Sequence, residues 1–410
     1  MTIAHIDVDA FFASVLVRAD PSLRGKPLLA LGMGGGCVIA ASYEAKAKGV
    51  KTGMRLLDAR KICPGAIERI SDFAEACRAS AHIEEILGRE CPAMEKMSVD
   101  EWFLDLRTLV GGIPKDTSAW AFDTQQMIRN NLALSVSIGI GPTKTIAKMA
   151  SEYRKPAGIT IIAHCTLQKN DSAMCNLQSF LDDCPAAAIP GIGRKRMMHA
   201  EKHGWNTAWD FAHAPKDTVV HLFGRPGGEL QQELLGKTMY PLKVDDRPPK
   251  SISRCRSFRR TGNEMAVYGQ LQEHMTVTVM RMRKEKLSAR NLSVWVRDQE
   301  YEHAGAECRL PRPMDTEEEL LPYARRAFRQ VWKKGGVATQ VGLALYTLSP
   351  AGGNQYSLFE DPILMHRRKN IQEALDDIHE RFGRDALVRG PVVALGRQRK
   401  KRTTMVGDIT

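Results

Sequence analysis

The sequence predicts an α+β protein with more than one domain, and three observations support this prediction. The chain has 410 residues, which exceeds the roughly 250–300 residues at which a single hydrophobic core stops growing. Segments with the two-residue period of strands alternate with segments of helical period from residue 2 to residue 347. A charged segment with adjacent prolines, DDRPPKS at 245–251, interrupts this pattern and marks the clearest domain boundary.

Composition and charge narrow the class of function. Lys and Arg number 59 against 47 Asp and Glu, and this net charge of +12 favours a polyanionic partner, nucleic acid first. The hydrophobic content of 43% is typical of a soluble globular protein. None of the nine cysteines forms a C-x-x-C pair, which argues against a zinc site and a disulfide framework. The sequence lacks the apolar run of a membrane helix and the apolar core of a signal peptide, so we expect a cytoplasmic protein, associated with the nucleoid when on DNA.

The N-terminal part predicts a sheet with helices and a small insert. Residues 2–8 indicate a short buried strand, and the nine residues FFASVLVRA have helical spacing. Between 27 and 62, two strand-like pieces around three glycines and two short helices predict an inserted subdomain. A helix at about 73–90 leads into the strand-like MSVDEWFLDL, and LSVSIGIG predicts a strand before the helix KTIAKMASEYR.

The C-terminal part predicts a second domain. Residues 180–240 indicate short-looped helices before the linker. After the linker the pattern predicts strand 252–260, helix 265–287, strands 291–298 and 305–311, helix 315–334 and strand 338–347. This βαββαβ order matches the split βαβ plan of a four-stranded sheet with two covering helices. From residue 348 onward we expect a mobile tail.

Four carboxylates in two strand-like segments form the first candidate site: Asp7, Asp9, Asp100 and Glu101. Adjacent antiparallel strands would bring them together. Clustered carboxylates raise one another's pKa unless cations neutralise them, so this cluster predicts hard divalent metals, most naturally Mg²⁺. Two Mg²⁺ ions held ~3.5–4 Å apart promote an in-line phosphoryl displacement. The alternative is that these acids are strand-end or capping residues on the surface.

A set of cations could bind phosphate: Lys46, Lys144, Lys148, Arg154 and Lys155. Solvated helix faces carry such charges too, so the alternative is a merely soluble surface. Tyr43 could stack on a nucleotide or hydrogen-bond to it, although a half-buried tyrosine is common.

Three further motifs indicate binding to DNA or protein. The P-G-I-G turn with Gly191, Gly193 and Arg194 is typical of a helix-hairpin-helix, which binds phosphate through backbone N–H groups, although a structural helix junction can look the same. The strand after the linker carries Lys250, Arg254, Arg256, Arg259 and Arg260 and is expected to face a duplex backbone, unless it is only a charged edge strand. In the tail, Gln355, Leu358 and Phe359 of QYSLF would fill a partner's groove or dock on their own domain.

Together these segments resemble one family. IAHIDVDAFFASV, VIAASYEAKAKGVKTGM, MSVDEWFLDL, SIGIGPTKTIAKMASEYRKP and IPGIG occur in the order and spacing of the Y-family translesion DNA polymerases of DinB/UmuC type, over roughly residues 2–347. The resemblance implies a right-hand polymerase from a bacterium or bacteriophage. Its parts would be a palm at 1–20 and 73–165, fingers at 21–72, a helical thumb at 166–244, a little finger at 250–347 and a tail at 348–410.

The resemblance also implies roles for single residues. The ligands of two Mg²⁺ ions would be Asp7, Asp100, Glu101 and the backbone carbonyl of Val8. Phe12 matches the aromatic steric gate that excludes a ribose 2′-hydroxyl, and Asp9 matches a recurrent residue without an assigned role. Contacts to the incoming triphosphate would come from Tyr43, Lys46 and Lys155. QYSLF is similar to the peptides by which bacterial polymerases bind the sliding β clamp, which would make Gln355, Leu358 and Phe359 clamp contacts.

The expected function is template-directed, low-fidelity translesion synthesis in DNA damage tolerance, in which the primer 3′-hydroxyl attacks a deoxynucleoside triphosphate. Primer-template DNA, the triphosphate, the clamp and accessory subunits are the expected partners. Leu16, Lys46 and Trp102 depart from the common pattern, and the Trp102 indole could narrow the metal site. The alternatives are a non-catalytic DNA-bound scaffold that recruits other polymerases, or another two-metal enzyme such as a nuclease or nucleotide cyclase, against which Phe12 and the P-G-I-G turn argue.

Overall fold

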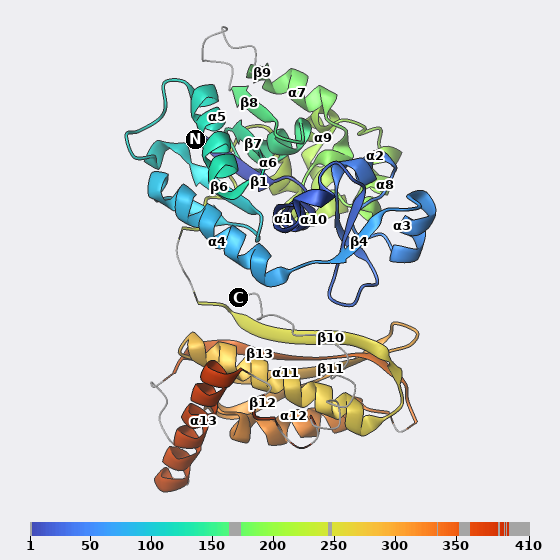
Figure 1. Cartoon of the computed structure of the whole chain (residues 1–410), viewed down its shortest axis with the longest axis vertical. Coiled ribbons are helices and arrows are strands. Elements are labelled where there is room, and N and C mark those ends of the chain that lie inside the picture. The colour runs from blue at the N-terminus through green and yellow to red at the C-terminus, as the bar shows by residue number, and fades with distance from the viewer. Residues whose placement is uncertain are drawn as a thin grey trace. The chain divides into compact units, whose positions relative to one another are not determined.

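The computed structural model describes residues 2–163, 174–244, 248–333, 335–351, 361–383 and 386–388, with residues 390 and 392. The chain divides into two compact units between Asp245 and Asp246, within the charged segment 245–251 (Figure 1). We call the part before this point unit 1 and the part after it unit 2. No helix among the described residues has the length and apolar character needed to cross a membrane.

The centre of unit 1 is a six-stranded sheet in the order β5-β6-β1-β7-β8-β9. Its strands are β1 (Ile3–Val8), β5 (Met94–Lys96), β6 (Glu101–Asp105), β7 (Val136–Gly141), β8 (Ile159–Ala163) and β9 (Met174–Asn176). Strand β1 is buried along its whole length and pairs antiparallel with both β6 and β7. The register sets Asp7 directly opposite Glu101. The sequence prediction that two carboxylate-bearing strands are antiparallel neighbours is therefore confirmed.

Helices cover both faces of this sheet. Because strand side chains alternate, Ala4, Ile6 and Val8 join the core formed with α1 (Phe11–Ala19), α4 (Phe73–Glu90) and α5 (Thr117–Leu132). Ile3 of β1 and Phe103 of β6 pack on the other face against α6 (Lys144–Tyr153). Helix α4 has an apolar face at helical spacing, and the Asp72 carboxylate accepts hydrogen bonds from two N–H groups of its first turn. The face that carries Asp7 and Glu101 is thus the one beside α6.

The predicted insert forms a three-stranded sheet in the order β3-β2-β4 with two short helices. Its elements are β2 (Leu28–Leu31), β3 (Val38–Ala41), α2 (Tyr43–Ala47), α3 (Leu56–Ile62) and β4 (Ile67–Ile70). A separate small core holds it together. Ser42 caps α2 and also accepts a hydrogen bond from the backbone of β2, so α2 is anchored directly to this sheet.

The helical end of unit 1 comprises α7 (Leu177–Asp183), α8 (Arg194–Lys202), α9 (Ala208–His213) and α10 (Lys216–Leu234). The P-G-I-G turn lies between a short 3₁₀ helix, Ala186–Ala188, and α8. Only the second of the two helices expected around this turn is therefore a full α-helix next to it. Helix α10 bends at Gly224, whose backbone is left-handed in φ, at 69°.

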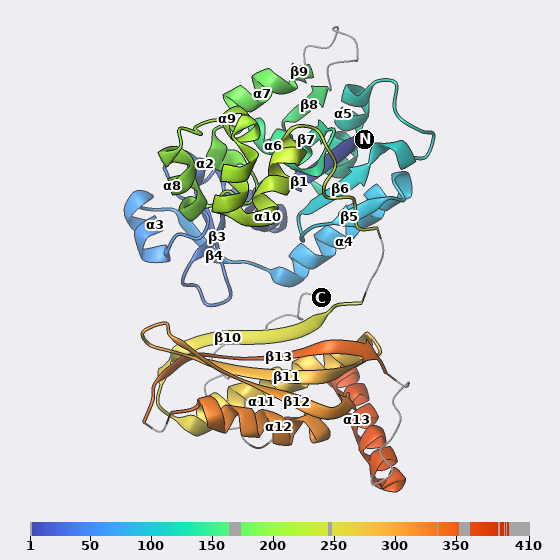
Figure 2. The same cartoon turned by 180° about the vertical axis from the view of Figure 1, so that it is seen from behind.

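Unit 2 has the predicted βαββαβ order. Its elements are β10 (Ser251–Thr261), α11 (Glu264–Lys284), β11 (Leu287–Asp298), β12 (His303–Met314), α12 (Glu317–Val331) and β13 (Ala338–Pro350). The sheet order β10-β13-β11-β12 leaves one strand between the two strands of each βαβ unit, as in a split βαβ fold. Both helices lie on one face of the sheet (Figure 2) and share its core.

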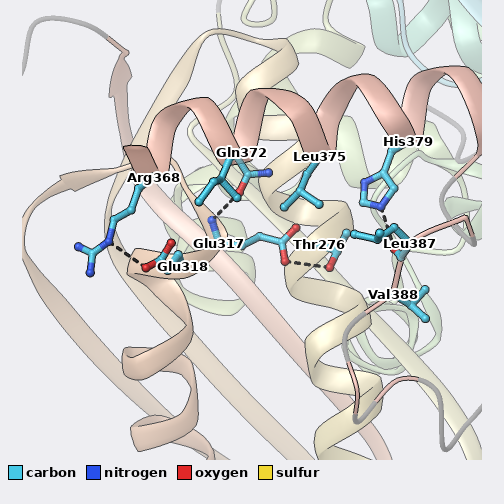
Figure 3. Close-up of a pocket in the computed structure, with 10 residues that line it drawn as sticks. Thr276, Glu317, Glu318, Arg368, Gln372, Leu375, His379, Leu387 and Val388 are labelled. Carbon is cyan, nitrogen blue, oxygen red and sulfur yellow. Dashed lines mark hydrogen bonds and ion pairs between the residues drawn. The ribbon is translucent and has the colours of Figure 1, made fainter. Parts of the chain in front are cut away.

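The expectation of a mobile tail from residue 348 is wrong for part of that segment. Strand β13 continues to Pro350, and α13 (Pro362–Phe382) is a 21-residue helix. Gln372 accepts a hydrogen bond from the Glu317 N–H at 2.9 Å, and Asp376 pairs with Arg283 at 2.6 Å (Figure 3 shows Gln372). Together with Leu387 and Val388, α13 lines a cavity of about 300 Å³ over α11 and α12.

Candidate active site

The sheet of unit 1 brings three carboxylates together. Carboxylate oxygens of Asp7 on β1, Glu101 on β6 and Glu152 on α6 lie within 4.8 Å of one another. We call these three residues the carboxylate cluster. Glu152 was not among the predicted site residues, although its place in the segment KMASEYRKP between Lys148 and Lys155 is a signal that could have found it.

Two lysines form ion pairs with the cluster. The Lys155 ammonium lies 2.5 Å from an oxygen of Asp7 and 2.6 Å from an oxygen of Glu152. Lys148, one helical turn before Glu152, forms an ion pair with Glu101. Two positive charges, one from α6 and one from the turn that follows it, therefore face three carboxylates.

The pKa values show the cost of burying these charges. Burial raises the pKa of Asp7 to about 7, although Lys155 opposes this shift. Burial also acts to raise the pKa of Glu101, but hydrogen bonding and the charge of Lys148 hold it below the ordinary value. The pKa of Lys155 is raised because Asp7 and Glu152 outweigh the effect of burial. An added cation at Asp7 would therefore compete with a proton near neutral pH.

Asp100 and Val8 lie at the edge of the cluster. The Asp100 carboxylate accepts a hydrogen bond from the Ser98 hydroxyl at 2.5 Å, and burial raises its pKa. The same hydroxyl lies 3.2 Å from Glu101. The Val8 N–H donates to the backbone carbonyl of Asp100 at 3.0 Å, which fixes the end of β1 against the start of β6.

His5 is a second residue that the sequence analysis missed. Its fully buried ring lies on the cluster side of β1, with Nδ1 2.7 Å from the Ser151 hydroxyl and Nε2 3.8 Å from Glu101. Burial, followed by the charges of the nearby lysines, keeps its pKa well below the ordinary value, so His5 is neutral. It supports Glu101 from the interior without adding a charge.

The insert contributes Tyr43 and Lys46 to the same neighbourhood. The Lys46 ammonium lies 4.6 Å from the centre of the Tyr43 ring, and the Tyr43 hydroxyl donates to Asp9 at 3.3 Å. Burial and then the charge of Asp9 raise the pKa of Tyr43, while burial and the charge of Lys155 lower that of Lys46. These mutual effects show that α2 stands close to the carboxylates.

Other predicted residues have different surroundings. The Phe12 ring packs 5.4 Å from that of Phe11 and 5.3 Å from that of Phe73, centre to centre. Lys144 pairs with Glu95 at 2.6 Å, and the Arg154 guanidinium lies 5.9 Å from the Tyr153 ring centre, so neither binds the cluster.

The departures at Leu16 and Trp102 do not crowd the cluster. Leu16 packs in a small core with residues of the insert. Trp102 is fully buried in the core on the opposite face of the sheet from Glu101, among residues of β1 and the covering helices. The expectation that its indole could narrow the metal site is therefore wrong, because alternation along β6 turns it away.

The P-G-I-G turn has the geometry of a backbone anion site. Gly191 has a left-handed backbone with φ of 92°, and Gly193 begins α8 without a side-chain cap. Buried Ile189 and Ile192 anchor the turn, while Gly191, Gly193 and Arg194 are exposed. Uncapped N–H groups at a helix start suit a phosphate oxygen.

The arginines of β10 differ in their surroundings. Arg254 and Arg256 alternate with the exposed Ser253, Cys255 and Ser257 and are only half-exposed. Both lie near enough to the buried His274 of α11 to lower its pKa, which puts them on the helix-covered side. Arg259 and Arg260, in the irregular stretch between the paired residues Ser257 and Thr261, are exposed. The exposure of the basic side chains therefore differs along the strand: Arg254 and Arg256 are half-exposed, and Arg259 and Arg260 are exposed.

The predicted clamp contacts Gln355, Leu358 and Phe359 lie outside the described residues.

Comparison with known proteins agrees with the geometry of both units. Residues 6–152 match the model of the impB/mucB/samB family, and residues 249–358 match the C-terminal domain of the same family. A DNA polymerase IV of Methanoculleus marisnigri is 30% identical over 365 residues, which cover 87% of this chain and 97% of the relative. The chain belongs to the Y family of DNA polymerases, in its DinB type.

Further relatives agree with this membership in the Y family. A DNA polymerase IV of Desulfatibacillum aliphaticivorans is 29% identical over 392 residues, covering 93% of this chain and 94% of the relative. A chimera of the Y-family polymerases Dbh and Dpo4 has the same fold with a TM-score of 0.72 at 22% identity, covering 85% of this chain and all of the chimera. DinB from Sulfolobus solfataricus gives a TM-score of 0.58 over 84% of this chain and 98% of its own. As a Y-family member, the chain is a DNA-directed DNA polymerase.

The donor set fits the divalent metal that such polymerases use. The carboxylate cluster offers only oxygen donors, which hard divalent cations prefer, and the burial of Asp7 makes its uncompensated charge unfavourable.

Proposed function

We propose that this chain performs template-directed, low-fidelity translesion DNA synthesis, with its catalytic residues in unit 1. The primer 3′-hydroxyl would attack the α-phosphorus of a deoxynucleoside triphosphate, and pyrophosphate would leave. The observation that supports this best is the carboxylate cluster, with Asp7 opposite Glu101 on one sheet face and Lys155 within hydrogen-bond distance of Asp7. A scaffold without catalysis would not need a carboxylate cluster in which burial raises the pKa of Asp7.

The metal ligands in this proposal are Asp7, Asp100, Glu101 and the backbone carbonyl of Val8. Two Mg²⁺ ions would lower the pKa of the attacking hydroxyl and stabilise the charge of the triphosphate. The chain's own contribution is to hold the acids in register through β1 and β6 and to keep Ser98 against Asp100 and Glu101. His5 excludes water from the inner side of Glu101.

The triphosphate contacts in this proposal are Tyr43, Lys46 and Lys155. Lys155 is bonded to Asp7 and Glu152, so the same ammonium can move to phosphate oxygens as negative charge arrives. Lys46 is only half-buried and its pKa is lowered by burial and by Lys155, conditions that an anionic ligand would relieve. Phe12, at the start of α1, is proposed as the steric gate under the sugar.

The other parts of the chain would hold DNA and partners. We assign the palm to 1–20 and 73–165, the fingers to 21–72, the thumb to 166–244 and the little finger to 250–347. Gly191, Gly193 and Arg194 would bind the duplex backbone, and the exposed Arg259 and Arg260 of β10 would add phosphate contacts. QYSLF at 355–359 would bind the sliding β clamp, and accessory subunits remain candidate partners. A three-stranded insert offers little surface with which to check a base pair, which fits low fidelity.

The deciding experiment is extension of a labelled primer on an undamaged template with Mg²⁺ and four deoxynucleotides. We expect the native protein to extend the primer, and Asp100→Ala to lose extension while its affinity for DNA changes by less than a few-fold. Glu84→Gln is a matched control, because this half-exposed acid of α4 pairs only with Lys96 among the described ion pairs. Extension by Asp100→Ala would refute the metal assignment, and failure of the native protein with DNA still bound would favour the scaffold.

A further inference from the structure

Asp9 is the best-connected carboxylate near the site, yet it does not belong to the carboxylate cluster. It follows β1, and only 1% of its surface is exposed. Its Oδ1 accepts hydrogen bonds from the Ser137 hydroxyl at 2.7 Å and the Tyr43 hydroxyl at 3.3 Å. Its Oδ2 accepts from the Ser135 hydroxyl at 2.9 Å and the Ala157 N–H at 2.8 Å.

These four bonds leave Asp9 no capacity for a metal ion. A carboxylate offers about four lone-pair sites, two on each oxygen, and each oxygen of Asp9 already has two donors. All four partners are donors, so the arrangement is matched to an acceptor-only group. The carboxylate therefore connects protein segments and does not ligate a cation.

The segments that Asp9 connects carry the proposed triphosphate contacts. Tyr43 begins α2 of the insert and supports Lys46 on its ring. Ala157 lies two residues after Lys155, in a turn where its backbone is left-handed with φ of 54°. Such a backbone is unfavourable for alanine, and the bond from its N–H to Asp9 helps to hold it. Ser135 and Ser137 fix the carboxylate to the sheet at β7.

We propose that Asp9 is a positioning residue for the incoming triphosphate, holding Tyr43 on one side and the Lys155 turn on the other at a fixed separation. This inference rests on the proposed polymerase function and assigns Asp9 a role distinct from that of the metal ligands. Because Tyr43 comes from the insert and Lys155 from the turn after α6, one carboxylate sets how these two segments present their cations to the same phosphates. The bond to Tyr43 is the longest of the four, so that side of the link is the easiest to loosen.

The test measures triphosphate binding apart from catalysis. The correct deoxynucleoside triphosphate is titrated, with Mg²⁺, into the full-length protein bound to a primer that ends in a dideoxynucleotide. We expect Asp9→Ala to raise the Kd of the triphosphate about tenfold or more, because charge-assisted hydrogen bonds are lost on both sides. The Kd for primer-template DNA should stay within about twofold. In extension assays the KM for the triphosphate should rise more than kcat falls.

Two variants separate positioning from general damage to the fold. Asp9→Asn should restore much of the affinity, because its oxygen can accept from Ala157 and Ser135 while its amide donates to the Ser137 and Tyr43 hydroxyls, which can rotate. Ser14→Ala is the matched control, since the Ser14 hydroxyl donates only to the backbone carbonyl of Asp9. Tyr43→Phe should weaken triphosphate binding in the native background and have little further effect in Asp9→Ala.

The outcomes distinguish this inference from the proposed function. If the native protein binds the triphosphate and Asp9→Ala binds it with the same Kd, the positioning role of Asp9 is overturned and the proposed function is not. Absence of triphosphate binding and of extension in the native protein would overturn both. If Asp9→Ala does not fold, Tyr43→Phe compared with Ser14→Ala decides: equal Kd values for the triphosphate would overturn the inference.

Discussion

In unit 1, the Lys155 ammonium lies 2.5 Å from Asp7 and 2.6 Å from Glu152, whereas in unit 2 four arginines lie along the single strand β10. In the carboxylate cluster each charge has a specific partner in a partly buried place, so removing one leaves another uncompensated. Along β10 the charges are half-exposed or exposed, and each contributes a small, screened share. Single residues should therefore decide activity in unit 1, while the summed charge of several residues should decide affinity for DNA in unit 2.

The largest effect is expected from Glu101→Gln, which keeps the shape of the side chain but removes its charge. Metal-assisted phosphoryl transfer depends on several kcal/mol of charge stabilisation, so kcat should fall about 10³-fold or more. Single-nucleotide incorporation in Mg²⁺ measures this loss, and Glu307→Gln on β12 provides the matched change in unit 2. A loss of similar size in Glu307→Gln would contradict this prediction, because an exposed acid of unit 2 would then matter as much for kcat as a carboxylate of the cluster.

A second prediction concerns the size of the Phe12 side chain in unit 1. Phe12→Ala should raise the kcat/KM for ribonucleotides relative to deoxynucleotides by about 10- to 200-fold, the range expected when a pocket is enlarged by a small group. Competition between the two kinds of nucleotide for one primer measures the ratio. Phe122→Ala removes an exposed aromatic ring of the same unit and should leave the ratio unchanged. An unchanged ratio in Phe12→Ala would remove the steric gate from the proposal.

Most of the long elements of both units were predictable from the sequence, but the 16-residue helix α5 was not predicted, nor were the strands β8 and β9. Helices α1 and α4 have the predicted bounds, and the six elements from β10 to β13 follow the predicted order with ends that differ by a few residues. Strands β4 and β5 were missed because they have four and three residues, too few to show a period. Helix α13 was missed because the glycine-containing segment before it and the basic residues after it indicated a tail.

Only a few contacts of the site were predictable from the sequence. Pairing of Asp7 with Glu101 follows from two strands, but the approach of Glu152 depends on how α6 packs over them. His5 and Ser151 are 146 residues apart, and Asp9 reaches Ser135 and Ser137 over more than 120 residues. No local period encodes such contacts, because tertiary packing alone decides which distant side chains meet.

A third prediction concerns how the stability of unit 2 depends on pH through its buried His274. Burial first, and then the charges of Arg254 and Arg256, lower the pKa of His274 to about 3. The unfolded chain, with a pKa of about 6.5, binds the proton first as pH falls. The contribution of this group to the free energy of unfolding is therefore fully present above about pH 6.5. It is lost as the pH falls toward 3, by about 1.4 kcal/mol for each pH unit.

Native protein should thus lose about 2 kcal/mol of unit 2 stability between pH 7.5 and pH 5 through this one group. Hydrogen exchange of α11 amides at the two pH values, corrected for intrinsic exchange rates, measures it. His274→Gln is the control that should lack this part of the pH dependence. If both proteins lose the same stability, His274 is not buried as a neutral group.

A smaller effect is expected where α13 meets α12. Thr316 precedes α12 without capping it, because its hydroxyl donates to Glu319, and the Glu317 N–H donates instead to Gln372 of α13. Gln372→Ala should lower the stability of unit 2 by about 1 kcal/mol, the usual cost of a lost helix cap. Hydrogen exchange of the first turn of α12 measures this, with the exposed Glu373→Ala as control. Equal exchange in both variants would mean that α13 does not stabilise α12.

The smallest effect separates the exposed from the half-exposed arginines of β10. Each phosphate contact contributes about 0.9 to the slope of log affinity against log salt concentration for duplex DNA. Arg259 is exposed, so Arg259→Ala should reduce this slope by about one contact while changing affinity only a few-fold. Arg254→Ala should leave the slope nearly unchanged, because Arg254 lies on the α11 side beside His274. A slope reduced by one contact in Arg254→Ala, with an unchanged slope in Arg259→Ala, would support the sequence-based assignment of Arg254 to DNA. It would also show that the helix-covered side of β10, rather than its exposed residues, meets the duplex.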